Sequence, residues 1–247
     1  MRRLNEQSVL LASLLCASAF IYLVHFAIFR DAYNIFFYGI MDVAFIPISV
    51  LLVTLVINRL LTERELQALL SKMDMVIGVF FSDVGTEMLR RFSCFDSRHE
   101  EYSQRLLVNG RWGPKQFQDA AREMQSWAYA IDSQNGDLEE LRVFLRGKRG
   151  FLLRLLENPN LLAHEAFTEL LLAVSHVAEE LDYRKDLKAL PRSDYAHLSG
   201  DIKRAYGLLI RKWLRYIEHL KANYPYLFSL AMRLNPFDTN ASVVVEE

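Results

Sequence analysis

Hydrophobic and polar residues are distributed unevenly along the chain, and the pattern changes near residue 58. Residues 8–57 contain only three members of the Asp, Glu, Lys and Arg set, whereas the later sequence is densely charged. These three are Arg30, Asp31 and Asp42. The pattern predicts two parts, a transmembrane hairpin over residues 1–58 and a cytoplasmic domain over residues 59–247.

The first part contains two apolar segments, at about 8–29 and 35–57, each long enough to cross a bilayer as a helix. Only the sequence RDAYN separates them, so the two spans must form an antiparallel hairpin. The alternative is a cleaved signal peptide, with Ala17–Ala19 as the small-residue cleavage site. The apolar run continues for ten residues beyond this site, which favours a membrane span.

Basic residues predict how the hairpin is oriented. They flank its two ends and are scarce in its turn, where Arg30 is beside Asp31. The flanking residues are Arg2, Arg3, Arg59, Arg64 and Lys72. Because positive charge favours the cytoplasmic side, we predict a protein of a prokaryotic inner (plasma) membrane with both termini in the cytoplasm.

Two polar residues and a proline interrupt the predicted spans. Counted from the outer ends, His25 lies about 6 Å and Asp42 about 10 Å below the outer surface, so the two can be neighbours. They could form a titratable pair on an ion or proton path, or line the centre of an oligomer. The interpretation we favour places His25 at the interface and gives Asp42 a hydrogen bond to a neighbouring helix, helped by carbonyls freed at Pro47.

The cytoplasmic part begins with a predicted long central helix over about 59–92. Apolar residues recur there at steps of three and four, as in an amphipathic helix. Small residues form a second stripe, which would allow close approach of another backbone. The stripe contains Ser71, Gly78, Ser82 and Gly85. It indicates a tightly packed helix that could also transmit a signal between the two parts.

The remaining sequence predicts further helices separated by clear breaks. Pro114 is placed to begin one helix and Asp137 to cap the next, while a long helix is expected from Ser193 to about Ala222. No strand-like alternation of useful length is present. The predicted fold class is therefore all-α, with a cytoplasmic domain of about six or seven helices.

Basic and apolar residues are interleaved between Leu141 and Leu156. The basic members are Arg142, Arg146, Lys148, Arg149 and Arg154. Such a segment suits anionic lipid headgroups or an acidic partner. The alternative that we favour is a helical hairpin that turns at the sequence GKRG and has a solvated basic rim.

Candidate metal ligands are few. His176 and Glu179 have the spacing found in carboxylate-bridged metal bundles, and Glu169 lies two turns earlier, but a second motif of this kind is missing. Cys16 and Cys94 are expected to be free thiols. Nucleotide-binding and nucleophile motifs are also absent, so we expect neither a cofactor, nor a bound metal, nor an enzyme.

Composition limits the possible functions. The chain is 52% hydrophobic and 24% charged, with a net charge of −1, which gives no electrostatic basis for binding nucleic acid. We predict a membrane-anchored helical interaction or regulatory protein that contacts a second copy, another membrane-associated protein or lipid at the inner leaflet. The alternatives are a homo-oligomeric ion or proton channel with Asp42 on its central path and an enzyme that lacks a familiar motif.

Overall fold

A computed structural model describes residues 2–162 and 165–244. Its secondary structure in these two ranges is helical throughout, apart from an isolated β-bridge between Asp96 and Ile131. The chain divides into two compact units. We call Met1–Gln67 the hairpin unit and Ala68–Glu247 the helical domain.

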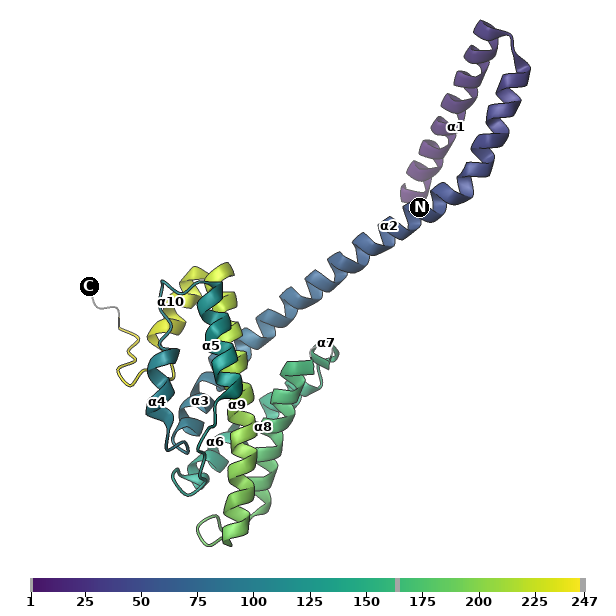
Figure 1. Cartoon of the computed structure of the whole chain (residues 1–247). Helices are drawn as coiled ribbons and strands as arrows, with labels where there is room; N and C mark the ends of the chain where they lie inside the picture. The colour runs from purple at the N-terminus through teal and green to yellow at the C-terminus, as the bar shows by residue number, and fades with distance from the viewer. Residues whose placement is uncertain (1, 163–164, 245–247) are drawn as a thin grey trace. The chain divides into compact units, whose positions relative to one another are not determined.

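The hairpin unit contains α1 (Arg2–Phe29) and the first part of α2 (Ala32–Phe80), which lie antiparallel and side by side (Figure 1). Arg30 has a positive φ of 49°, and its amide donates to the Phe26 carbonyl at 2.9 Å, which closes the end of α1. Asp31 then accepts a hydrogen bond from the Asn34 amide at 3.2 Å and caps α2. Both predicted apolar helices and the tight turn between them are present.

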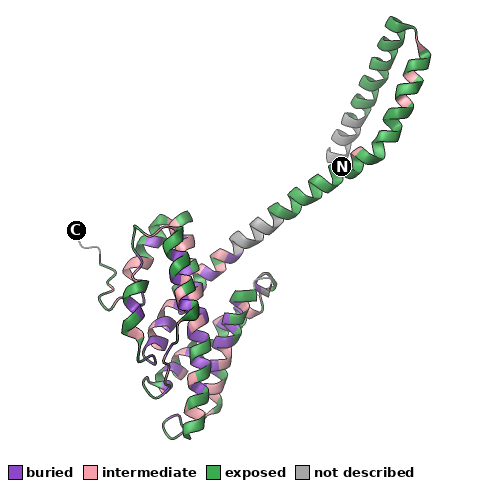
Figure 2. Cartoon of the chain, viewed as in Figure 1, coloured by how far each residue is buried: buried purple, intermediate pink, exposed green. Residues whose placement is uncertain are grey.

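Apolar side chains of the hairpin unit face outward. Two stretches, Ala12–Phe29 and Ala32–Arg64, are long and apolar enough to cross a membrane. None of the side chains described in these stretches is buried, as the green colour of the hairpin in Figure 2 shows. The hairpin therefore does not use these residues to build a core of its own.

The predicted boundary at residue 58 falls inside α2, which continues to Phe80. The chain then forms a π-helical turn, η1 (Phe81–Gly85), before α3 (Thr86–Ser93). The Thr86 amide and hydroxyl both donate to the Phe81 carbonyl, the hydroxyl at 2.9 Å, which stabilises the wider turn. The segment predicted as one central helix is thus helical over almost its whole length, but its geometry changes at Phe81.

The helical domain is built around α9 (Arg192–Asn223), which packs against α3, α5, α8 and α10. The other elements are α4 (His99–Ser103), the 3-10 turn η2 (Gln104–Leu106), α5 (Pro114–Ser126), α6 (Leu138–Leu156), α7 (Pro159–Leu162), α8 (Glu165–Tyr183) and α10 (Pro225–Arg233). Apolar residues that recur at helical spacing along α9 are buried. These residues are Ile202, Leu209, Trp213, Ile217 and Leu220.

Local signals set several helix ends as predicted. Pro114 is the first residue of α5, and Asp137 caps α6 by accepting from the amides of Glu139 and Glu140 at 2.9 Å. The turn predicted at GKRG is wrong, because α6 continues through Gly147 and Gly150. Leucines on both sides of the two glycines remain buried on one face of this helix, and their packing outweighs the weak helix preference of glycine.

A buried polar group fixes the loop before α6. The Asp96 carboxylate accepts from the amides of Arg98 and Ala130 at 3.0 and 3.1 Å, and its other oxygen lies 3.0 Å from the Tyr102 hydroxyl. Tyr102 in turn hydrogen-bonds to Tyr206 of α9 at 2.8 Å. Burial raises the pKa of both tyrosines, so both hydroxyls stay protonated. The loop is therefore held to the core through hydrogen bonds.

Candidate functional site

Helices α8 and α9 pack against each other, and each carries a histidine followed four residues later by a carboxylate. The pairs are His176 with Glu180 on α8 and His197 with Asp201 on α9. Residues four apart lie on the same face of a helix, one turn from each other. The two pairs meet at the α8–α9 contact, and we call these four residues the His/carboxylate cluster.

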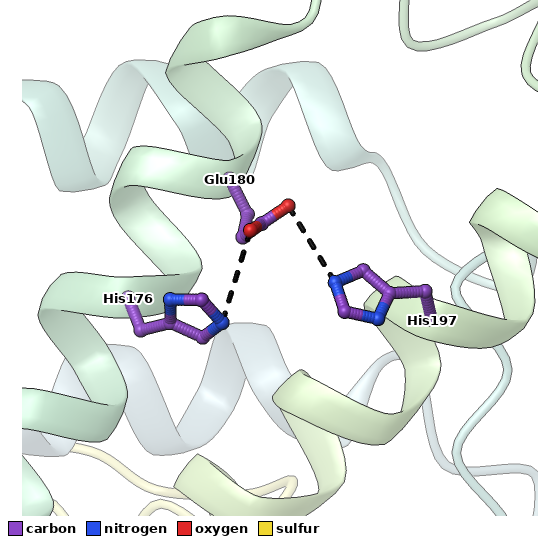
Figure 3. A group of neighbouring side chains, drawn as sticks. All are labelled: His176, Glu180 and His197. Carbon is purple, nitrogen blue, oxygen red and sulfur yellow. Dashed lines mark ion pairs between the residues drawn. The ribbon is translucent and has the colours of Figure 1, made fainter.

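Ring nitrogens and carboxylate oxygens face one another in this cluster (Figure 3). Glu180 lies between the two rings, with Oε1 3.8 Å from His176 Nε2 and Oε2 3.6 Å from His197 Nε2. The Oδ2 atom of Asp201 approaches the same two nitrogens, at 3.4 Å from His176 and 3.2 Å from His197. One atom each from His176, Glu180 and His197 can lie within 4.8 Å of the others, close enough to share a single ion.

Asp201 is the most buried member of the cluster. Its side chain is 5% exposed, whereas the side chains of His176 and His197 are 44% and 51% exposed. Asp201 Oδ2 has no hydrogen-bond donor of suitable geometry among the described residues, although the two ring nitrogens are close. A buried carboxylate oxygen left in this way is unfavourable unless something pairs with it.

Arginines hold the cluster from outside. Arg184 donates to Glu180 Oε2 at 2.6 Å and also binds both oxygens of Asp194, at 2.6 and 2.7 Å. Its hydrogen bond lowers the pKa of Glu180 and keeps this carboxylate ionised at neutral pH. On the other side, Arg204 lies 3.5 Å from Asp201 Oδ1. An arginine therefore lies beside each carboxylate, at Oε2 of Glu180 and at Oδ1 of Asp201.

The metal candidates named from sequence are only partly brought together. His176 belongs to the cluster, but Glu169 and Glu179 are exposed and are not part of it. Glu179 instead lies beside Arg146, in a shallow depression on the surface of α6 and α8. Glu180, His197 and Asp201 were not predicted as ligands, because the expected carboxylate–histidine motif has a spacing of three residues, whereas the two pairs in the structure have a spacing of four. The sequence does contain a signal for this cluster, because a histidine is followed four residues later by a carboxylate in each of two predicted helices.

The predicted basic patch does not form one free basic surface. Arg142 binds Glu139 and donates to the Arg184 carbonyl at 2.8 Å. The others have acidic partners within the domain, except for Arg154, which makes no ion pair among the described residues. These partners are Asp182 for Arg146 and Arg149, at 2.8 and 3.7 Å, and Asp83 for Lys148, at 3.3 Å.

The predicted stripe of small residues has two separate contacts. The side chain of Ser71 lies outside the described residues, and Ser82 is exposed. A Cβ atom at Gly78 would meet the ring of Tyr216 at 3.6 Å, an ordinary contact. At Gly85 it would lie only 2.6 Å from the Phe81 ring, so this position requires glycine. Gly85 is the last residue of the π-helical turn η1, whereas Gly78 lies in α2 before it, so the two glycines have different environments.

The two polar residues predicted to pair within the spans, His25 and Asp42, are not joined in the described part of the hairpin unit. His25 is exposed, and its ring lies 4.8 Å from that of Phe29. Asp42 is also exposed, and within the described ranges no hydrogen bond or ion pair joins it to His25. Pro47 is accommodated inside α2, which remains helical on both sides of it. The predicted His25–Asp42 pair stays a prediction for the protein in a bilayer.

Comparison with known proteins finds relatives for both units. Residues 69–233 match a family model described as "Uncharacterized protein MJ1433, C-terminal helical domain", and residues 2–61 match "MJ1433, N-terminal helical domain". The chain is 44% identical over 248 residues to Uncharacterized protein MJ1433 of Methanocaldococcus jannaschii, an alignment that covers 99% of each protein. No solved structure matches. The interval between the two matched segments contains the division after Gln67.

Proposed function

The chain belongs to the MJ1433 family and contains both of its helical domains, and from this we propose a function that uses the two units together. The hairpin unit anchors the protein in the inner membrane of a prokaryotic cell. The helical domain acts at the cytoplasmic surface as an interaction or regulatory module. Its partner is a second copy of the chain or another membrane-associated protein.

The observation that carries this proposal is the exposure of apolar residues along the hairpin. A core helix of a soluble protein would bury one face, yet the side chains described in Ala12–Phe29 and Ala32–Arg64 are not buried. Surfaces of this size and composition are unfavourable in water, and a bilayer would cover them. The second apolar helix, joined to the first by a two-residue turn, supports a membrane hairpin over a cleaved signal peptide.

Contacts with protein are better supported than contacts with lipid headgroups. Headgroup binding needs basic side chains that are free to reach the membrane surface. Arg146 and Arg149 pair with Asp182, and Lys148 pairs with Asp83, so much of the basic charge on α6 is compensated within the domain. Asp42 supports a second copy as one partner, since an exposed carboxyl group in an apolar span needs a hydrogen-bonding group from another helix.

Cysteine labelling in intact cells tests the anchoring and its orientation. In a Cys16→Ser background, a cysteine placed at Ala32 should react with a membrane-impermeant thiol reagent, because Ala32 lies at the turn predicted to face outward. Cys94 is exposed on the helical domain and should react only after the cells are permeabilised. Labelling of Cys94 in intact cells, or recovery of the full chain in the soluble fraction, would contradict the proposal.

A further inference from the structure

We propose that the His/carboxylate cluster binds one divalent transition-metal ion, of which Zn²⁺ is the representative, and that this ion joins α8 to α9. The ligands are one ring nitrogen each of His176 and His197 and one carboxylate oxygen of Glu180, and Oδ2 of Asp201, which lies beside both rings, is the fourth candidate ligand. This inference does not depend on the membrane anchor. It assigns a binding site to residues that the proposed function leaves unused.

Ligand atoms from α8 and α9 lie close enough together to share one ion. Tetrahedral Zn²⁺ has bonds of about 2.0–2.2 Å to nitrogen and oxygen, which places its ligand atoms about 3.4 Å apart. Oδ2 of Asp201 lies 3.2 Å from Nε2 of His197 and 3.4 Å from Nε2 of His176, while Glu180 approaches these nitrogens with two different oxygens, Oε2 at 3.6 Å and Oε1 at 3.8 Å. The two Asp201 separations are close to the edge of a coordination tetrahedron, and one ligand atom each of His176, Glu180 and His197 lies within 4.8 Å of the others.

The buried oxygen of Asp201 points to a ligand independently of the cluster's composition. This side chain is 5% exposed, and its Oδ2 lacks a hydrogen-bond donor among the described residues while it faces both rings. Coordination to a cation would satisfy this oxygen and would also use the lone pairs of two neutral imidazoles. Nitrogen and oxygen donors in this ratio are suited to first-row transition metals more than to Ca²⁺ or Mg²⁺, which prefer oxygen alone.

The surroundings also resemble those of a metal site. Arg184 fixes the carboxylate of Glu180, and Arg204 lies beside the oxygen of Asp201 that faces away from the histidines. Such outer partners orient metal ligands. The two rings are about half exposed, so an ion can enter from solvent. Because one pair of ligands comes from each helix, binding should stabilise the contact between α8 and α9 and raise the melting temperature.

Titration of the full-length protein tests the site. The protein is purified in detergent without a polyhistidine tag, treated with a chelator and titrated with Co²⁺, whose visible absorption reports tetrahedral coordination. We expect one equivalent to bind, Zn²⁺ to displace it, and Zn²⁺ to raise the melting temperature. His176→Ala and His197→Ala should each weaken binding by more than about 100-fold, beyond the loss expected for an outer partner.

Matched substitutions separate coordination from general damage. Glu180→Gln and Asp201→Asn keep the shapes of the side chains but weaken their ligand character, so both should reduce affinity by at least about tenfold. Two controls should bind Co²⁺ like the parent protein. These are Glu179→Gln, on the residue next to Glu180, and His219→Ala, at a histidine of α9 that instead lies 3.3 Å from Asp74.

Each result decides for or against the site. The proposal would be overturned if the folded parent protein bound well under one equivalent of Co²⁺. It would also be overturned if the His176→Ala/His197→Ala double variant still bound one equivalent of Co²⁺. Circular dichroism identifies any variant that fails to fold, and the conservative Glu180→Gln variant then provides the comparison. Reduced binding in the cluster variants together with normal binding in both controls would establish the site.

Discussion

The hairpin unit and the helical domain are both helical, yet their apolar side chains have opposite environments. Phe20 in α1 is 66% exposed, whereas Phe92 in α3 is completely buried. Figure 2 shows the same contrast over the two units, with buried residues collected in the domain. Hydrogen bonds within each helix satisfy the backbone in water and in lipid alike. The two units therefore differ in the environment of their apolar side chains and not in their secondary structure.

Ionisable residues follow the same division. In the helical domain, buried Asp96 is surrounded by hydrogen-bond donors, and buried Lys212 lies 5.7 Å from the centre of the Phe167 ring. In the hairpin unit, Asp42 is exposed among apolar residues. The domain therefore surrounds its buried charges with its own residues, whereas the hairpin unit leaves the Asp42 side chain exposed.

The largest expected difference between the units comes from the same substitution made in each. Phe92→Ala removes a fully buried ring and should lower the free energy of unfolding of the domain by about 3–5 kcal/mol. Phe20→Ala removes an exposed ring and should change this free energy by less than about 0.5 kcal/mol. Urea titration of the full chain in detergent measures both through tryptophan fluorescence, because all three tryptophans lie in the helical domain.

Equal effects of the two substitutions would contradict the contrast. If Phe20→Ala destabilised the domain as much as Phe92→Ala, the apolar face of α1 would have to be part of the same core. Membrane association provides the reverse control, since Phe92→Ala should leave the protein in the membrane fraction.

Lys212 predicts a smaller effect, which depends on pH. Burial lowers the pKa of Lys212 to about 8 from its ordinary 10.5, nearby Arg215 acts in the same direction, and Asp74 opposes them. Between about pH 8 and pH 10.5, which are the folded and unfolded pKa values of Lys212, the unfolded chain binds more protons than the folded chain, so stability rises with pH. Between pH 7.5 and 9.5 the unfolding free energy of the parent protein should rise by about 1–3 kcal/mol more than that of the Lys212→Met variant.

Parallel urea titrations of the parent and Lys212→Met proteins at several pH values isolate this contribution. Other groups titrate in the same range, but they are common to both proteins and cancel in the difference. Parallel stability curves for the two proteins would show that Lys212 is as well solvated in the folded state as in the unfolded one.

Asp42 in the hairpin unit should have the smallest effect on free energy. If Asp42 forms a hydrogen bond to another helix, Asp42→Asn should be nearly silent, while Asp42→Leu should weaken subunit association by about 1–2 kcal/mol. Analytical ultracentrifugation in detergent measures this association, with Phe20→Ala as the control.

A conducting role for Asp42 would give a different result. In that case Asp42→Asn would abolish pH-dependent flux into reconstituted vesicles without changing association. A coupled pair with His25 further requires that Asp42→Asn and His25→Ala be non-additive, and strictly additive effects would exclude the pairing.

Local patterns were sufficient to predict much of the fold. The polar turn at Arg30 and Asp31, the helix start at Pro114 and the cap at Asp137 each depend on residues close together in sequence. The buried stripe of α9 follows from helical periodicity. These features were predictable because a few neighbouring residues determine them.

Features that depend on distant residues were not predictable in the same way. No residue near the sequence GKRG indicates that α6 continues through it, because the helix is stabilised there by the packing of its leucines against α8. The His/carboxylate cluster requires the relative positions of α8 and α9, which are joined by a loop and fixed by side-chain packing.

The central position of α9 has a consequence for how the protein is made. Ribosomes deliver a chain from its N-terminus, and α9 comes after every other large helix of the domain. Until Arg192–Asn223 has emerged, the apolar faces of α3, α5 and α8 lack the helix against which they pack. The domain must therefore complete its folding late in synthesis, and a stop codon before Arg192 would leave a product whose earlier helices have no common core.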